Sequence, residues 1–229
     1  MSDTLNGQSR LAHHFVDLQQ QKSAATLGMW LFLATEVLFF GGLFVAYTLY
    51  KLKYYEAFVA GSHELSITLG CVNTAILITS SLTMALGVYG AQTGRKAFAC
   101  NSLLATLALA GAFLVVKYFE WSAKFEHHLV PGPDFQFDVT HAAAVVANPE
   151  LLRIEHVKMF FILYYIMTGL HGIHVVAGIG VIAWLYTQAR KGVYSAEYYT
   201  PVELVGLYWH FVDIVWIFLF PLLYLLGRH

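Results

Sequence analysis

The stretch Tyr208-Trp209-His210-Phe211-Val212-Asp213-Ile214-Val215-Trp216 lies at the centre of a long apolar run, residues 203–226. About twenty mostly apolar residues are enough to cross a bilayer as an α-helix. His210 and Asp213 lie near the middle of this run, where an ionisable side chain is costly unless it is paired or faces protein. The sequence therefore predicts a membrane helix that packs against neighbouring helices.

One side of this helix carries the side chains that a neighbour would contact. Trp209, His210, Asp213 and Trp216 are spaced i, i+1, i+4 and i+7, which places them on one side of an α-helix. The opposite side is apolar and is expected to face lipid or another apolar helix.

The composition of the whole chain favours the same membrane setting. Of its 229 residues, 58% are hydrophobic and 12% are charged, and the mean hydropathy is +0.60, outside the range of soluble globular proteins. A net charge of -1 gives no electrostatic argument for binding nucleic acid. Cys71 and Cys100 belong to apolar runs, where a free thiol behaves as a small hydrophobic group. We expect an integral membrane protein with no nucleic-acid partner.

Five apolar runs predict an all-α membrane bundle of five transmembrane helices. Residues 1–25 are polar and are expected to form an N-terminal tail ahead of the membrane domain, residues 26–229. This tail contains no apolar core, so no cleavable signal peptide is expected. The predicted spans are residues 26–50, 67–91, 99–121, 156–186 and 203–226. Residues 122–155 are predicted to form a surface loop with room for one short helix.

The distribution of basic residues indicates the orientation. Arg95-Lys96 and Arg190-Lys191 lie in the second and fourth links between the spans, on the same predicted side as Arg10 and Lys22. Because short cytoplasmic loops carry an excess of Lys and Arg, this pattern favours a cytoplasmic N-terminus. We expect a multi-pass protein of the bacterial inner membrane.

Four of the spans resemble subunit III of the haem-copper oxidases, the cytochrome c and quinol oxidases of respiratory chains. The matching stretches are Thr35-Glu36-Val37-Leu38-Phe39-Phe40, Asn73-Thr74 with Ser80-Ser81, Thr168-Gly169-Leu170-His171-Gly172-Ile173-His174-Val175 and residues 208–216. The commoner form of the family has seven spans, so the resemblance implies a short five-helix form that lacks the first two helices. A second departure is Lys117, one turn from Glu120, where the family usually has glutamine.

The resemblance implies a function without chemistry in this chain itself. It implies an accessory subunit that supports stability, lipid and oxygen access and proton uptake of the catalytic subunit during reduction of oxygen to water, in aerobic electron transport coupled to proton translocation. The haems and copper are expected in the partner subunits I and II, and bound phospholipid is expected on this chain. The family motifs also imply five packing positions: Asn73, Gly169, Gly172, Trp209 and Trp216.

Five titratable side chains near the middle of their spans form the candidate site: Glu36, His171, His174, His210 and Asp213. Pairs spaced i, i+3 could chelate a metal, and histidines on two helices could ligate a haem. The alternative, which we favour, is a polar layer whose members satisfy one another without a metal. Within such a layer Glu36 is expected to be a neutral acid that donates a hydrogen bond to His174 or His210, because desolvation disfavours its charged form.

Other interpretations remain open at this point. His13 and His14 titrate near neutral pH and could buffer protons on the uptake side, or they could belong to a tail without a role. An accessory protein of a nitric oxide reductase and an independent membrane cytochrome are alternative functions. A transporter is disfavoured, because no inverted repeat or broken midplane helix is evident.

Overall fold

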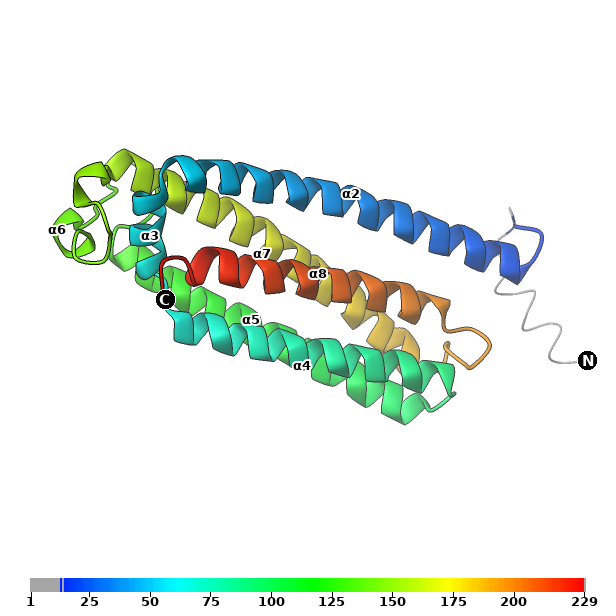
Figure 1. The fold of residues 1–229 in the computed structure, drawn as a ribbon. Coiled ribbons are helices and arrows are strands. Elements are labelled where there is room, and N and C mark those ends of the chain that lie inside the picture. Colours follow the sequence, from blue (N-terminus) through cyan, green and yellow to red (C-terminus); the bar gives the residue numbers. More distant parts are fainter. Residues whose placement is uncertain (1–12, 14, 229) are drawn as a thin grey trace, which may run out of the picture.

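The computed structural model describes residue 13 and residues 15–228, and every regular element among these residues is a helix (Figure 1). Five helices are long and apolar enough to cross a membrane. They are α2 (Leu18–Lys53), α4 (Ile67–Gln92), α5 (Lys96–Glu126), α7 (Ile154–Arg190) and α8 (Thr200–Tyr224). The predicted all-α fold with five candidate spans is confirmed.

Helix α8 is the central element of the bundle. It packs against α4 and α7, and α5 closes the group by packing against both α4 and α7. Helix α2 lies on the other side of α8, where it contacts α8 and α7 (Figure 1). Side chains of α8 also reach α5, so α8 contacts all four other long helices and its side chains have partners on several sides.

The first helix begins earlier than the sequence predicts. The carboxylate of Asp17 accepts a hydrogen bond from the backbone N–H of Gln20 at 2.7 Å, which caps the helix one residue before Leu18. Residues 18–25, which were predicted to belong to the polar tail, therefore extend α2. Helix α5 likewise continues to Glu126, five residues beyond the predicted end of the third span. The apolar residues of a sequence predict the part of a helix that lies in hydrocarbon, but they do not predict where its polar ends begin and stop.

A short helix between the first two spans was not predicted. Helix α3 (Tyr55–His63) is largely buried and closes one end of the bundle, with the Phe58 ring against those of Tyr47 and Phe160. The Arg228 guanidinium donates hydrogen bonds to the carbonyl oxygens of Ser62, His63 and Leu65 at 2.9, 3.0 and 2.9 Å. The C-terminal segment thus caps the last turn of α3, where unpaired carbonyl groups need donors.

The segment between α5 and α7 contains two short elements, α6 (Val139–Ala142) and a 3₁₀ turn (Pro149–Leu151). It is tied to α3 by Glu56, whose carboxylate accepts hydrogen bonds from the Ala147 N–H at 3.1 Å and the Asn148 side chain at 2.9 Å. The predicted surface loop is therefore anchored to the closed end of the bundle.

Helices α7 and α8 approach closely at Gly178. A Cβ atom added at Gly178 would lie 2.6 Å from Cζ3 of Trp209, well inside van der Waals contact. Trp209 is fully buried, and its Nε1 donates a hydrogen bond to Ser80 Oγ on α4 at 3.1 Å. One indole ring therefore sets the spacing of α4, α7 and α8, and it can do so only because residue 178 has no side chain.

This contact predicts opposite effects for two neighbouring glycines. Gly178→Ala should destabilise the protein by about 1–3 kcal/mol, because the buried Trp209 ring has to move. Gly180→Ala, where nothing lies within 4 Å of the added atom, should leave stability unchanged or raise it slightly through better helix propensity. Thermal unfolding of the detergent-solubilised variants, followed by circular dichroism, measures both. Equal midpoints for the two variants would contradict the packing described here.

Candidate functional site

Three charged side chains lie inside the bundle on one face of α5. Lys117, Glu120 and Lys124 are only 7%, 2% and 5% exposed. Lys117 Nζ donates to Glu120 Oε2 at 3.0 Å, and Lys124 Nζ donates to Glu120 Oε1 at 3.3 Å. Charges in such surroundings are tolerated only when they are paired and hydrogen-bonded. Glu120 is the acceptor that both lysines share.

Two tyrosines from other helices complete this cluster. The hydroxyls of Tyr164 on α7 and Tyr224 on α8 donate to Glu120 Oε1 at 2.9 and 2.6 Å. The same hydroxyl oxygens accept from Lys117 Nζ at 3.3 and 2.6 Å. We call Lys117, Glu120, Lys124, Tyr164 and Tyr224 the Glu120 network. It joins α5, α7 and α8, and its one carboxylate receives four donors.

The sequence shows Lys117 and Glu120 one turn apart, but it does not predict this network. The available signal was the spacing of Lys117, Glu120 and Lys124 at i, i+3 and i+7, which places three charges on one face of an apolar helix. The tyrosine partners carry no comparable signal, because they come from helices whose facing could not be read from apolar runs.

Glu36 and His174 form a second polar contact, between α2 and α7. His174 Nε2 lies 3.1 Å from Glu36 Oε2, and His174 Nδ1 lies 2.8 Å from the carbonyl oxygen of Leu170. A carbonyl can only accept, so Nδ1 carries a hydrogen. Nε2 then either accepts the proton of a neutral Glu36 or, as part of an imidazolium, donates to a carboxylate. In both forms the pair shares one proton, and the predicted contact between Glu36 and His174 is present.

The other three candidate residues do not join this pair. His210 Nδ1 lies 2.7 Å from Ser81 Oγ on α4. Neither ring nitrogen of His171 and neither carboxyl oxygen of Asp213 has a hydrogen-bond partner within the described part of the chain. The predicted layer whose members satisfy one another is therefore not formed by this chain alone.

The helical positions explain the separation. His171 packs against Phe113 of α5 and Trp216 of α8, with ring centroids 5.6 and 5.2 Å apart. His174, three residues later, turns toward α2, where its ring lies 5.2 Å from that of Phe40. Similar depth in the membrane therefore did not bring the five side chains together. Across residues 13 and 15–228, no group of three or more His, Cys, Asp or Glu side chains is placed to hold a metal ion.

The positions assigned to packing by the family motifs lie in the core or beside a groove. Trp216 Nε1 donates to Thr74 Oγ1 at 3.0 Å, so it joins α8 to α4 in the same way as the bond from Trp209 to Ser80. The Asn73 side chain is fully buried, and its amide has no hydrogen-bond partner among the described residues.

The two histidines that were considered for proton buffering precede α2. His13 is exposed, whereas His14 lies outside the described residues.

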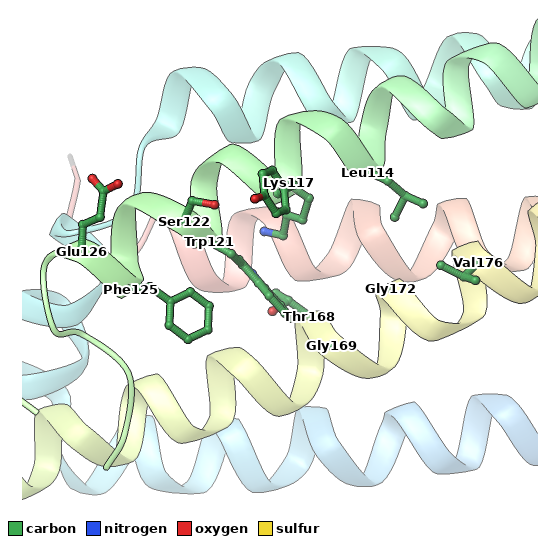
Figure 2. Close-up of a pocket in the computed structure, with 11 residues that line it drawn as sticks. Leu114, Lys117, Trp121, Ser122, Phe125, Glu126, Thr168, Gly169, Gly172 and Val176 are labelled. Atoms are coloured by element: carbon green, nitrogen blue, oxygen red, sulfur yellow. The ribbon is translucent and has the colours of Figure 1, made fainter. Parts of the chain in front are cut away.

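Gly169 and Gly172 line a groove of about 700 Å³ between α5 and α7 (Figure 2). Figure 2 shows Trp121 and Phe125 projecting from α5, with Trp121 reaching toward Gly169 on α7. The groove is open beside Gly172, because no atom lies within 4 Å of the place where a side chain would begin. Its walls are mostly apolar, and Glu126 lies at the end of α5. The shape and polarity suit an acyl chain or another slender apolar group.

The fold defines a multi-pass, all-α membrane protein with paired polar side chains between its helices. The family model described as cytochrome c oxidase subunit III matches residues 154–228. Cytochrome c oxidase subunit 3 of Thermostichus vulcanus is 32% identical over 203 residues, covering 88% of this chain and 87% of the relative. The chain therefore belongs to the subunit III family of the haem-copper oxidases.

Two further relatives extend the comparison. Cytochrome bo(3) ubiquinol oxidase subunit 3 of Pseudomonas putida is 29% identical over 88% of this chain and 85% of its own length. The haem-copper oxidase subunit I+III of Aeropyrum pernix is 31% identical over 86% of this chain, which spans only 22% of that longer protein. The resemblance noted in the sequence is confirmed.

The Glu120 network predicts a large effect of removing its acid. Glu120→Gln removes the carboxylate that pairs two buried ammonium groups and should destabilise the protein by about 3–5 kcal/mol. The double variant Glu120→Gln with Lys117→Gln should recover part of this loss, because it removes one of the unpaired cations. Thermal unfolding in detergent compares the two. A single variant as stable as the parent, or a double variant less stable than the single one, would contradict the network.

Proposed function

We propose that the chain is a non-catalytic, cofactor-free subunit III of a respiratory haem-copper terminal oxidase. The observation that carries this proposal is the match to Thermostichus vulcanus subunit 3 over 88% of this chain and 87% of that protein. The haems and copper would lie in partner subunits, and oxygen would be reduced to water there. This chain would contribute to the working life of that complex.

The partner we propose is the catalytic subunit I, with subunit II in the same complex. The relative from Aeropyrum pernix supports subunit I as the partner, because its name joins subunits I and III in one protein. Two proteins that occur fused in one organism commonly function side by side in another. We further propose the bacterial inner membrane, with a cytoplasmic N-terminus, from the basic pairs beside α4 and α7.

A role in lipid and oxygen access is supported by the groove between α5 and α7. The groove has a volume of about 700 Å³ and mostly apolar walls, and its lining residues Tyr118 and Phe125 are 70% and 57% exposed. An acyl chain seated there would bury part of this surface. Dioxygen is apolar and partitions into such chains, so a lipid-filled groove would lead oxygen along the bundle rather than into water.

A role in proton uptake would rest on the N-terminal tail, while the pair between α2 and α7 would be mainly structural. Glu36 and His174 hold one shared proton, and their side chains are 19% and 17% exposed at the surface of the bundle. His13 is exposed ahead of α2, on the side proposed to be cytoplasmic, and His14 next to it lies outside the described residues. The tail would buffer protons, and the pair would serve mainly as a contact between α2 and α7.

Purification in mild detergent tests the proposal. A tagged chain should bring down a catalytic haem-copper oxidase subunit, identified by mass spectrometry, with haem absorbance proportional to that subunit. Recovery of the chain without any oxidase subunit would contradict the proposal. A haem Soret band that stays with the isolated chain would favour an independent cytochrome instead.

Variants of Glu36 separate a structural role from a place on a proton path. Glu36→Gln keeps the shape and the hydrogen bond to His174, so oxygen reduction and proton pumping should stay near normal. Glu36→Ala removes the contact between α2 and α7 and should lower the amount of assembled complex or shorten its activity during turnover. Oxygen consumption and proton release by the reconstituted complex measure both effects. Loss of pumping in Glu36→Gln with normal assembly would place Glu36 on a proton path.

A further inference from the structure

A second groove runs along the seam between α4 and α8. It consists of two hollows of about 410 and 200 Å³ that share Ala85 and His210 and therefore lie end to end. On α4 the lining extends from Leu77 to Gln92, which is about 22 Å at the rise of an α-helix. We call these two hollows the α4–α8 groove. Its length covers most of the hydrocarbon thickness of about 30 Å.

The rim of the α4–α8 groove is apolar and uncovered. Ile78 and Leu82 on α4 are 53% and 60% exposed, and Ile214 and Ile217 on α8 are 50% and 45% exposed. These four residues line the larger hollow from both sides. The surface therefore suits an apolar rod lying along the seam, which leaves an acyl chain and a transmembrane helix as the two possible occupants.

Asp213 lines the larger hollow, and the hydrogen-bonding needs of its carboxyl distinguish between these two occupants. The residue is only 3% exposed, yet neither of its carboxyl oxygens has a hydrogen-bond partner within the described part of the chain. Ser81 lies near enough for its hydroxyl to act on the carboxyl, although outside the usual hydrogen-bond geometry, and its Oγ also lies 2.7 Å from His210 Nδ1. Whether charged or neutral, the carboxyl therefore keeps hydrogen-bonding capacity that the described part of this chain leaves unused.

The depth of Asp213 excludes a lipid as that partner. It lies about 20 Å from the first residue of the 25-residue helix α8, close to the middle of the membrane. Phospholipid headgroups stay at the interface, acyl chains have no hydrogen-bonding group, and the hydrocarbon core holds no water. A side chain on another membrane helix can reach this depth and bring a polar group with it.

The charged residues that line the groove indicate whether the incoming side chain is a hydrogen-bond donor or an acceptor. The lining contains the acids Asp213 and Glu203 and no Lys or Arg. In the first turn of α8, Glu203 Oε2 lies 3.9 Å from Lys22 Nζ, so Glu203 already has a counter-charge. Asp213 has no such ion pair within the described part of the chain. The carboxyl of Asp213 offers acceptor oxygens in both its charged and its neutral form, so a donor on the incoming side chain fits it in either state.

We propose that the α4–α8 groove is the docking site for a transmembrane helix of another chain, which places a hydrogen-bond-donating side chain near its middle against Asp213. The proposal rests on the proposed function in one respect, because that function requires a membrane partner. It adds the surface of this chain that the partner occupies and the chemistry of the side chain that fits it.

Photo-crosslinking in native membranes tests the occupant directly. A benzophenone amino acid at Leu82, in the groove, should form an adduct with a membrane segment of another protein. The matched control is Leu104, which is 49% exposed on α5 and lies away from the groove; it should label lipid. Lipid adducts alone at Leu82 would overturn the proposal, as would a protein adduct at Leu104 with none at Leu82.

Filling the groove tests the same contact without a probe. Ala85→Trp blocks the point where the two hollows meet and should lower the amount of partner retained in mild detergent at least tenfold. Ala108→Trp, at an exposed alanine on α5, should change it less than twofold. The amount of each variant inserted in membranes serves as the folding control. Equal retention of partner by both variants would overturn the proposal.

The polar contact has its own pair of variants. Asp213→Leu removes the acceptor and should lower partner retention about tenfold, while Asp213→Asn keeps an acceptor oxygen and should retain several times more partner than Asp213→Leu. Full retention by Asp213→Leu would overturn the role of Asp213. If the chain purifies with an oxidase subunit but Leu82 labels only lipid, this inference fails and the proposed function stands. If Leu82 labels a protein that belongs to no oxidase, the proposed function fails and the docking site stands.

Discussion

The bundle depends on one constraint, which is that a polar group inside a membrane protein needs a partner from the protein. The clearest case is the carboxylate of Glu120, which receives donors from two lysines and two tyrosines. The two lysines lie on α5 like Glu120, whereas the two tyrosines lie on α7 and α8. A buried ion group of this kind adds little net stability over an apolar core, but it is costly to disrupt. It therefore fixes which faces of the three helices meet.

Apolar packing sets the remaining geometry around α8. Two tryptophans, Trp209 and Trp216, each bury an indole ring and donate from Nε1 to a hydroxyl on α4. Without a hydrophobic effect between helices in lipid, close contact and such hydrogen bonds supply most of the association. Gly178 allows α7 to approach the Trp209 ring. A small number of specific contacts, each an indole against a hydroxyl or a glycine, thus hold the helices together.

The sequence was most informative where hydrophobicity alone decides structure. The five long helices follow from apolar runs, and the contact between Glu36 and His174 was one of two predicted alternatives. Helix α3 was missed because its nine residues are too few to stand out from a loop, although Phe58 packs in the core. The Glu120 network and the separation of His171 from His174 depend on how each helix is rotated. Rotation is set by packing between helices, which no single apolar run records.

The acidic residues within the membrane helices divide into those satisfied within the chain and those that are not. Glu120 on α5 and Glu36 on α2 have hydrogen-bond partners, whereas the carboxyl oxygens of Asp213 on α8 have none within the described part of the chain, although Asp213 is as deeply buried as Glu120. A subunit that completes its polar interior only on assembly would meet its partner through such a group. The most direct measurement is an electron cryo-microscopy map of the complex in a lipid bilayer. The account predicts a side chain of another subunit within hydrogen-bond distance of the Asp213 carboxyl. Density for lipid alone in the α4–α8 groove, with Asp213 unpartnered or bonded within this chain, would contradict it.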